Sequence, residues 1–246
     1  FVISVIYLYK NRARLGFDFK LHSFKPSKER LVPICKLGIP YIAQWLLITC
    51  SMMYVNARVN MFGVTASAVD SIGNKLNSIV VGAVSVSSAT MIGQCFGARK
   101  LDRIKHCYRA CLAICMISCA ILCGTYLLFP KQIFTLFSSE ADVIAMSPQY
   151  MVIAAVWVLS VCTMTAPYSV VDGVGNAMLG LVISVLDGVV ARIGLCILLG
   201  NTMGLSGFWL GNALAGFVTT IMAGVYYYSG AWKKRQLLLK RDEAPQ

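Results

Sequence analysis

The sequence predicts an all-α membrane protein, a polytopic bundle of transmembrane helices. Of its 246 residues, 58% are hydrophobic and only 13% are charged, whereas soluble domains are close to half apolar and a quarter charged. The apolar residues gather in six runs of about 20 residues, the length that crosses a bilayer. Lysine and arginine concentrate in alternate gaps between these runs. The composition therefore excludes a disordered chain and an ordinary soluble enzyme.

The first 36 residues precede the six runs. Residues 1–9 are apolar and are followed by basic residues, which is the reverse of the order in a signal peptide. They are also too few to cross a bilayer. We interpret them as the end of a truncated transmembrane helix, so we expect the chain to be part of a longer protein. Residues 10–36 are polar and basic, and we interpret them as a cytoplasmic connector between two lobes.

The six runs form a predicted transmembrane lobe over residues 37–229, and glycine, proline or charge marks the gaps between them. The runs extend from Leu37 to Ala57, Val69 to Met91, Cys107 to Phe129, Gln149 to Val171, Met178 to Gly200 and Gly207 to Ser229. Residues 230–246 are basic and then acidic, and we interpret them as a cytoplasmic C-terminal tail.

Basic residues distinguish the two sides of the predicted lobe. If all six runs cross the membrane, eighteen lysines and arginines lie on one side, and only Arg58 and Lys131 lie on the other. Cytoplasmic loops are enriched in these residues, so the sequence predicts a multi-pass protein of a bacterial plasma (inner) membrane with a cytoplasmic C-terminus. This topology accounts for most of the net charge of +12. We therefore expect membrane lipid as a partner and no nucleic acid.

The second run carries a polar stripe. Asp70, Asn74, Asn77, Ser85 and Ser88 follow one another at helical spacing and share one face of a helix. A charged group at the bilayer centre costs roughly 3 kcal/mol, so this face must turn to the bundle interior or to a water-filled cavity. We interpret it as part of a substrate or ion pathway. Hydrogen bonding between helices is the structural alternative.

The fifth run contains an acidic and a basic residue. From Met178, Asp187 lies about 14 Å along the helix and Arg192 about 21 Å, at 1.5 Å per residue. Asp187 is therefore expected near the membrane midplane, where a carboxylate indicates a functional site. Residues five apart do not face each other on an α-helix. We therefore expect partners on other helices, such as Lys75 for Asp187 or Asp70 for Arg192, with a structural ion pair as the alternative.

Two amides of the first run complete the predicted pathway. Gln44 lies within the run, where its side chain lines a cavity or bonds to another helix, and Asn60 follows the end of the run.

A row of cysteines occupies the third run. Cysteine recurs every four residues from Cys107 to Cys123. Steps of four drift by about 40° on a helix of 3.6 residues per turn, so the thiols spread over a broad arc and do not enclose a tetrahedral metal. We interpret them as small residues that allow close helix packing, and we expect no metal site.

The sequence contains no motif of a nucleotide-binding or hydrolytic enzyme. It has no G-x-x-x-x-G-K-[ST], no H-E-x-x-H and no G-x-S-x-G. We expect neither an enzyme nor an organic cofactor. If the protein moves solutes, the energy must come from an ion gradient or from another subunit.

Several short motifs resemble the multidrug and toxic compound extrusion (MATE) family. They are Lys36-Leu-Gly-Ile-Pro40, Val59-Asn-Met-Phe-Gly63, Ala66-Ser-Ala-Val69, Met91-Ile-Gly-Gln-Cys-Phe-Gly-Ala-Arg99 and Asp172-Gly-Val-Gly-Asn-Ala177. The resemblance implies a secondary antiporter with two six-helix lobes, of which residues 37–229 form the C-terminal one. It further implies export of small-molecule organic cations in exchange for Na⁺ or H⁺, with the N-terminal lobe of the same protein as partner.

The resemblance leaves the position of the coupling carboxylate open. Some members carry an acidic residue in the first helix of this lobe, but this chain has none between Leu37 and Ala57. Coupling then rests on Asp70 or Asp187, or on the N-terminal lobe. Two alternatives to drug export are a lipid-linked saccharide flippase of the same superfamily, whose cavity would need more cationic residues, and a non-transporting truncated membrane fragment.

Overall fold

The protein is described by a computed structural model that covers residues 2–11 and 28–234; within its helices, the side chains of residues 2–4, 8, 29, 30, 33 and 77–81 are not described. Most of the predicted connector and of the predicted tail therefore lies outside the described residues. The chain divides into two units, Phe1–Ile39 and Pro40–Gln246.

The first unit contains helix α1 (Val2–Lys10) and the beginning of helix α3 (Lys28–Asn60). We expected a polar connector as far as residue 36, but α3 begins at Lys28. Its first residues, Lys28 to Leu31, are all strong helix formers, and no glycine lies between them and the first apolar run. The helix therefore extends nine residues beyond the start of the predicted run.

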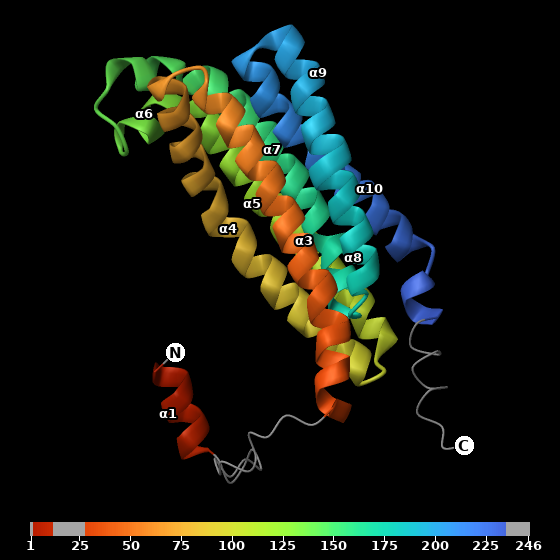
Figure 1. Ribbon diagram of the computed structural model, residues 1–246. Helices are drawn as coiled ribbons and strands as arrows, with labels where there is room; N and C mark the ends of the chain where they lie inside the picture. The colour runs from red at the N-terminus through yellow and green to blue at the C-terminus, as the bar shows by residue number, and fades with distance from the viewer. Residues whose placement is uncertain (1, 12–27, 235–246) are drawn as a thin grey trace. The chain divides into compact units, whose positions relative to one another are not determined.

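The second unit is a bundle of antiparallel helices that Figure 1 shows side by side. The part of the chain that the structure describes contains no strand. After α3, the elements are α4 (Val64–Gly97), α5 (Leu101–Leu128), α6 (Pro130–Thr135), α7 (Ala141–Gly173), α8 (Ala177–Ser184), the π-helix η2 (Val185–Ile193), α9 (Gly194–Met203) and α10 (Leu205–Tyr228).

Five helical stretches are long and apolar enough to cross a membrane among the residues that were described. They are Ile34–Asn60, Leu101–Leu128, Ala141–Gly173, Ala177–Met203 and Leu205–Tyr228. The remaining run, the second one from Val69 to Met91, lies within α4, which has 34 residues, but the side chains of residues 77–81 at its centre are not described. At 1.5 Å per residue α4 measures about 50 Å, which exceeds the hydrocarbon thickness.

Helix α7 is the centre of the second unit, because it packs against α4, α5 and α10. The α3–α4 turn, α6 and the α9–α10 turn gather at one end of the bundle, called here the Gly63 end; the α4–α5 and α7–α8 turns lie at the opposite, Gly175 end (Figure 1). Gly63, Gly175 and Gly204 adopt positive φ angles of 104°, 66° and 62° in these turns, a conformation that favours glycine.

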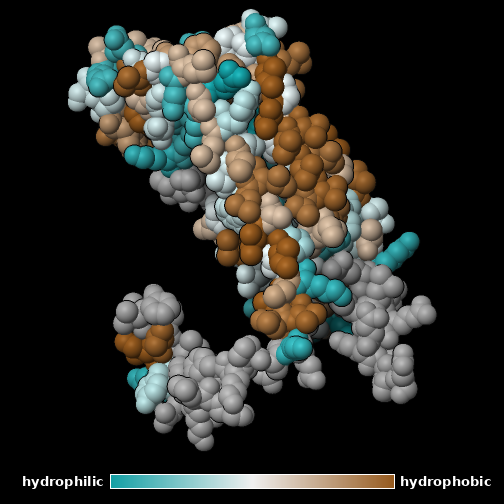
Figure 2. Space-filling view, in the orientation of Figure 1, coloured by the Kyte–Doolittle hydropathy of each residue, from teal (hydrophilic) through white to brown (hydrophobic). Residues whose placement is uncertain are grey.

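The outer surface of this unit is apolar along much of its length. Figure 2 shows hydrophobic side chains over the middle of the visible helices, with hydrophilic ones gathered toward the Gly63 end. Ile117 and Ile121 of α5, for example, are 62% and 64% exposed. Large apolar side chains turned outward on spanning helices are expected where lipid is the solvent.

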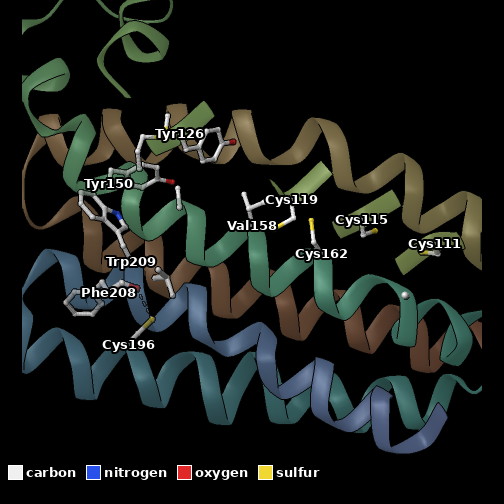
Figure 3. Close-up of a cluster of buried hydrophobic side chains, with 14 of the residues drawn as sticks. Cys111, Cys115, Cys119, Tyr126, Tyr150, Val158, Cys162, Cys196, Phe208 and Trp209 are labelled. Carbon is white, nitrogen blue, oxygen red and sulfur yellow. Dashed lines mark hydrogen bonds between the residues drawn. The ribbon is translucent and has the colours of Figure 1, made fainter. Parts of the chain in front are cut away.

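The predicted row of cysteines lies inside the core. Cys111, Cys115 and Cys119 of α5 are buried, and Figure 3 shows the row beside Cys162 of α7. The described residues contain no group of three or more metal-ligating side chains. The burial of these small side chains between two packed helices agrees with their interpretation as packing residues.

Candidate ion and substrate pathway

The two charged residues of the fifth run pair with each other. An oxygen of the Asp187 carboxylate lies 3.3 Å from a nitrogen of the Arg192 guanidinium, and both side chains are more than 90% buried. Our expectation that each charge would pair with a charge on another helix is therefore wrong, and the ion pair that we gave as the alternative is present. The reason is that Val185–Ile193 is a π-helix, whose hydrogen bonds join residues five apart and bring such residues to the same face.

Arg192 connects this ion pair to two neighbouring helices. Its Nη1 atom donates a hydrogen bond to Oδ1 of Asn212 in α10 over 2.6 Å, and lies 3.4 Å from Sδ of Met52 in α3. Its Nε–H is buried and has no partner among the described residues. A buried charge is tolerated when it is paired and hydrogen-bonded, so Asp187 and Asn212 together hold the guanidinium inside the bundle.

A small polar cavity adjoins Asn212 on the side of the Gly63 end. It measures about 20 Å³, enough for one water molecule. Side chains from α4, α7 and α10 line it: Asp70, Asn74, Tyr150, Ile153, Ala154, Trp157, Trp209 and Asn212. Within it, Nδ2 of Asn74 donates a hydrogen bond to Oδ2 of Asp70 over 2.9 Å. Asp70 and Asn74 of the predicted stripe thus line the same cavity.

Close helix packing places Tyr150 in this cavity. Gly73 lies between Asp70 and Asn74, and a Cβ at Gly73 would overlap the Tyr150 ring. The absence of a side chain at Gly73 therefore lets the Tyr150 ring of α7 pack directly against the backbone of α4. The Tyr150 and Trp209 rings pack edge to face with their centroids 4.9 Å apart, and Figure 3 shows them beside one end of the cysteine row.

Gln44 belongs to a second polar cluster, nearer the Gly175 end. Its Nε2 atom donates a hydrogen bond to the Tyr168 hydroxyl, while its Oε1 atom is buried without a partner among the described residues. The Tyr41 hydroxyl donates to Oδ1 of Asp172 over 3.3 Å. These bonds join α3 to α7, so Gln44 makes the contact between helices that was one of its two expected roles.

The structure brings together only part of the predicted pathway. Asp70 and Asn74 line the cavity, and Asp187 and Arg192 reach it through Asn212. Asn60 lies apart, at the α3–α4 turn, where its Oδ1 atom accepts a hydrogen bond from the Ser67 hydroxyl over 2.8 Å. The side chain of Asn77 lies outside the described residues.

Sequence reasoning missed Tyr150, Trp209 and Asn212. Asn212 is a lone amide in the apolar sequence of α10. An isolated polar residue in a spanning helix indicates a functional or interhelical contact, so Asn212 could have been predicted on the same ground as Gln44. Tyr150 and Trp209 carried no such signal, because aromatic residues are common in apolar runs.

Comparison with known proteins places this fold in a family. The family model MatE matches residues 40–198. The "Probable multidrug resistance protein YoeA" of Bacillus subtilis (strain 168) is 27% identical over 243 residues, which are 96% of this chain and 52% of that protein. The chain spans about half the length of the curated relatives that it matches.

Two solved structures share the fold at lower identity. The Vibrio cholerae MATE transporter VcmN in its bent form is 20% identical, with a TM-score of 0.77 over 95% of this chain and 53% of that one. A MOP superfamily transporter from Pyrococcus furiosus is also 20% identical, with a TM-score of 0.75 over 91% and 50%. These relatives are named as resistance proteins or transporters rather than enzymes. With the MatE model matched across most of its helical bundle, this multi-pass membrane chain belongs to the MatE family.

Proposed function

We propose that this chain acts as the C-terminal half of a secondary active antiporter that exports organic cations in exchange for Na⁺ or H⁺. The observation that carries the proposal is the polar network inside the second unit, in which Asp187, Arg192 and Asn212 connect to the cavity at Asp70. Membership of the MatE family and the names of its relatives support a transport role.

The network supplies what such a carrier requires in its interior. Ionisable residues inside spanning helices are rare and mark ion and substrate pathways. Asp70 is itself part-exposed, and its hydrogen-bond partner Asn74 is exposed on the surface of the second unit. The exchange would follow if a cation in the pathway and the coupling ion competed for the same negative charge, so that only one was carried at a time.

The partner of this half is an N-terminal lobe of the same protein. Alternating access in such carriers comes from rocking of two repeats about a central site, and α3 offers the surface for a second lobe, since Trp45, Leu46 and Met53 are 71%, 60% and 65% exposed. The basic residues on the Gly175 side of the bundle support a plasma-membrane orientation with that side and the C-terminus in the cytoplasm.

The flippase alternative is less well supported. A lipid-linked pyrophosphate would call for uncompensated positive charge inside the bundle. Arg192 is buried against Asp187, so the pair contributes no net charge to an anionic ligand.

Export of ethidium by the full-length parent protein tests the proposal. The gene would be expressed in a bacterium that lacks its own efflux pumps, and loss of ethidium fluorescence would be followed with and without sodium, and after a protonophore collapses the proton gradient. We expect export that stops in one of these conditions, which identifies the coupling ion. Absence of gradient-dependent export of ethidium and of other organic cations would refute the proposal and favour a flippase or a non-transporting protein.

A further inference from the structure

The cavity at Asp70 has features that point to its occupant. Its volume of about 20 Å³ holds one small molecule. It lies between three helices, and its polar atoms converge from separate parts of the chain: Asp70 and Asn74 from α4, Tyr150 from α7, and Trp209 and Asn212 from α10. A carboxylate in so small a site can be neutralised by a cation or by a proton, and the surrounding atoms distinguish these cases.

An unpaired donor lies opposite the carboxylate. Trp209 is only 4% exposed, and its indole N–H has no hydrogen-bond partner among the described residues. Asp70 lines the same cavity, and the indole makes no direct hydrogen bond to its carboxylate. An unsatisfied buried donor costs about 1–3 kcal/mol. A water molecule in the cavity would accept from the indole and donate to the carboxylate, and would thereby satisfy both groups.

The same atoms offer few ligands to a bare metal cation. The amide oxygen of Asn212 already accepts from the Arg192 guanidinium at 2.6 Å, so a positive charge stands directly behind the one amide oxygen that α10 contributes. The Trp209 N–H turns its positive end to the cavity. Only the Asp70 carboxylate, the Asn74 oxygen and the Tyr150 hydroxyl remain, whereas hard cations such as Mg²⁺ and Ca²⁺ take six or more oxygen ligands.

The net charge around Asp70 falls from negative to zero when Asp70 takes up a proton. On its own helix Asp70 accepts a hydrogen bond from Asn74, and Lys75, the next residue after Asn74, is exposed. Helix α7 contributes Tyr150 to the cavity, and η2 acts through Arg192, whose charge Asp187 neutralises. Helix α5 contributes no residue to the lining. With Asp70 ionised, this carboxylate and the buried pair of Asp187 and Arg192 together carry a net negative charge. With Asp70 protonated, they are neutral and no longer attract an organic cation.

We infer that this cavity binds a proton on Asp70 together with one water molecule held by Trp209, and that it is the coupling site within this half of the protein. The inference rests on the proposed function for the step in which an organic cation and the proton exclude each other. The proton site itself stands on the cavity and its donors, and is tested separately.

The first measurement uses no transported substrate. Infrared difference spectra of the purified full-length protein between high and low pH report carboxyl C=O bands that appear on protonation. We expect a band in the wild type that Asp70→Asn removes and that Asp142→Asn retains, since Asp142 is an exposed residue in the first turn of α7. An unchanged spectrum in Asp70→Asn would overturn the inference.

The second measurement follows ethidium binding by fluorescence anisotropy as the pH is lowered, in potassium or in sodium salt. We expect binding to weaken through a midpoint that Asp70→Asn abolishes and that does not depend on the salt. Trp209→Phe keeps an aromatic ring but removes the N–H that holds the water donating to the charged carboxylate. Its midpoint should therefore rise by about one pH unit, equivalent to about 1.4 kcal/mol.

These outcomes separate the two proposals. Sodium that displaces ethidium from the wild type but not from Asp70→Asn would identify a sodium site and overturn the inference while leaving the antiporter intact. A Trp209→Phe midpoint equal to that of the wild type would remove the role of the indole. An Asp70-dependent infrared band without any binding of organic cations would uphold the proton site and refute the proposed substrate class.

Discussion

Replacing Asp187 by asparagine leaves the Arg192 guanidinium in the bundle without its counter-charge. Removing one partner of a buried ion pair costs about 3–5 kcal/mol, because the other charge stays buried and uncompensated. Here Asn212 still accepts from Nη1 of Arg192, so we expect a loss near the lower end, about 3 kcal/mol. That corresponds to roughly a hundredfold change in the unfolding equilibrium, since 1.4 kcal/mol is a factor of ten.

The chain offers a matched control for this loss. Lys105 and Asp102 form an ion pair of the same length, 3.3 Å, but their side chains are 45% and 92% exposed. Exposed pairs contribute about 0–1 kcal/mol, so Asp102→Asn should change the free energy of unfolding by less than 1 kcal/mol. The assay is a titration of the purified full-length protein with sodium dodecyl sulfate, in which tryptophan fluorescence reports unfolding.

The double variant Asp187→Leu with Arg192→Met separates the cost of an unpaired charge from that of lost packing. Replacing a whole buried pair by apolar residues of similar volume is often neutral or stabilising, so the double variant should be more stable than Asp187→Asn. Two results would refute the reasoning: a cost for Asp187→Asn no larger than that for Asp102→Asn, or a double variant less stable than Asp187→Asn.

Three further predictions follow from the packing and from the proposed orientation. Gly73→Ala should destabilise the protein by about 1–3 kcal/mol in the same titration, because the new methyl group overpacks the contact between α4 and α7. Gly82→Ala is the control: its Cα has open space around it, so it should stabilise the protein by up to about 1 kcal/mol. Equal effects of the two substitutions would contradict the packing. Asn60→Ala should leave ethidium export unchanged, because, among the described residues, the Asn60 side chain bonds only to Ser67 at the α3–α4 turn. A severalfold loss of export would show that Asn60 is part of the transport pathway. In a cysteine-free background, a membrane-impermeant maleimide should label Ser138→Cys in intact cells, and Lys233→Cys only after the cells are opened; the reverse pattern would invert the proposed topology.

The sequence was sufficient to predict most of the helical architecture. The apolar runs fall on α3, α5, α7 and α10 and on the continuous stretch Ala177–Met203, because burial in lipid imposes length and composition together. The ends were less accurate. α7, for example, begins at Ala141 rather than near Gln149, since hydropathy marks the part of a helix in the bilayer and does not mark the turns that extend beyond it.

The candidate site was predicted in its charged residues and in Asn74, which shares the helix face of Asp70. Asp70, Asp187 and Arg192 were identifiable because a charge in an apolar run needs an explanation. Their partners depended on which helices lie side by side and at what level. Asn212 approaches Arg192 from α10, and Gln44 meets Tyr168 of α7 across more than a hundred residues of sequence. No spacing within a single run contains that information.

The π-helix explains how one spanning segment hides two opposite charges. On a regular α-helix, positions five apart diverge by about 140°, since each residue turns about 100°. If Val185–Ile193 were α-helical with Asp187 facing α10, Arg192 would turn toward α3 or lipid, and exposure at the bilayer centre would cost roughly 3 kcal/mol. The wider turn brings both side chains to one face. The π-helical register therefore creates the ion pair, and through Asn212 it sets the positive charge behind the cavity at Asp70.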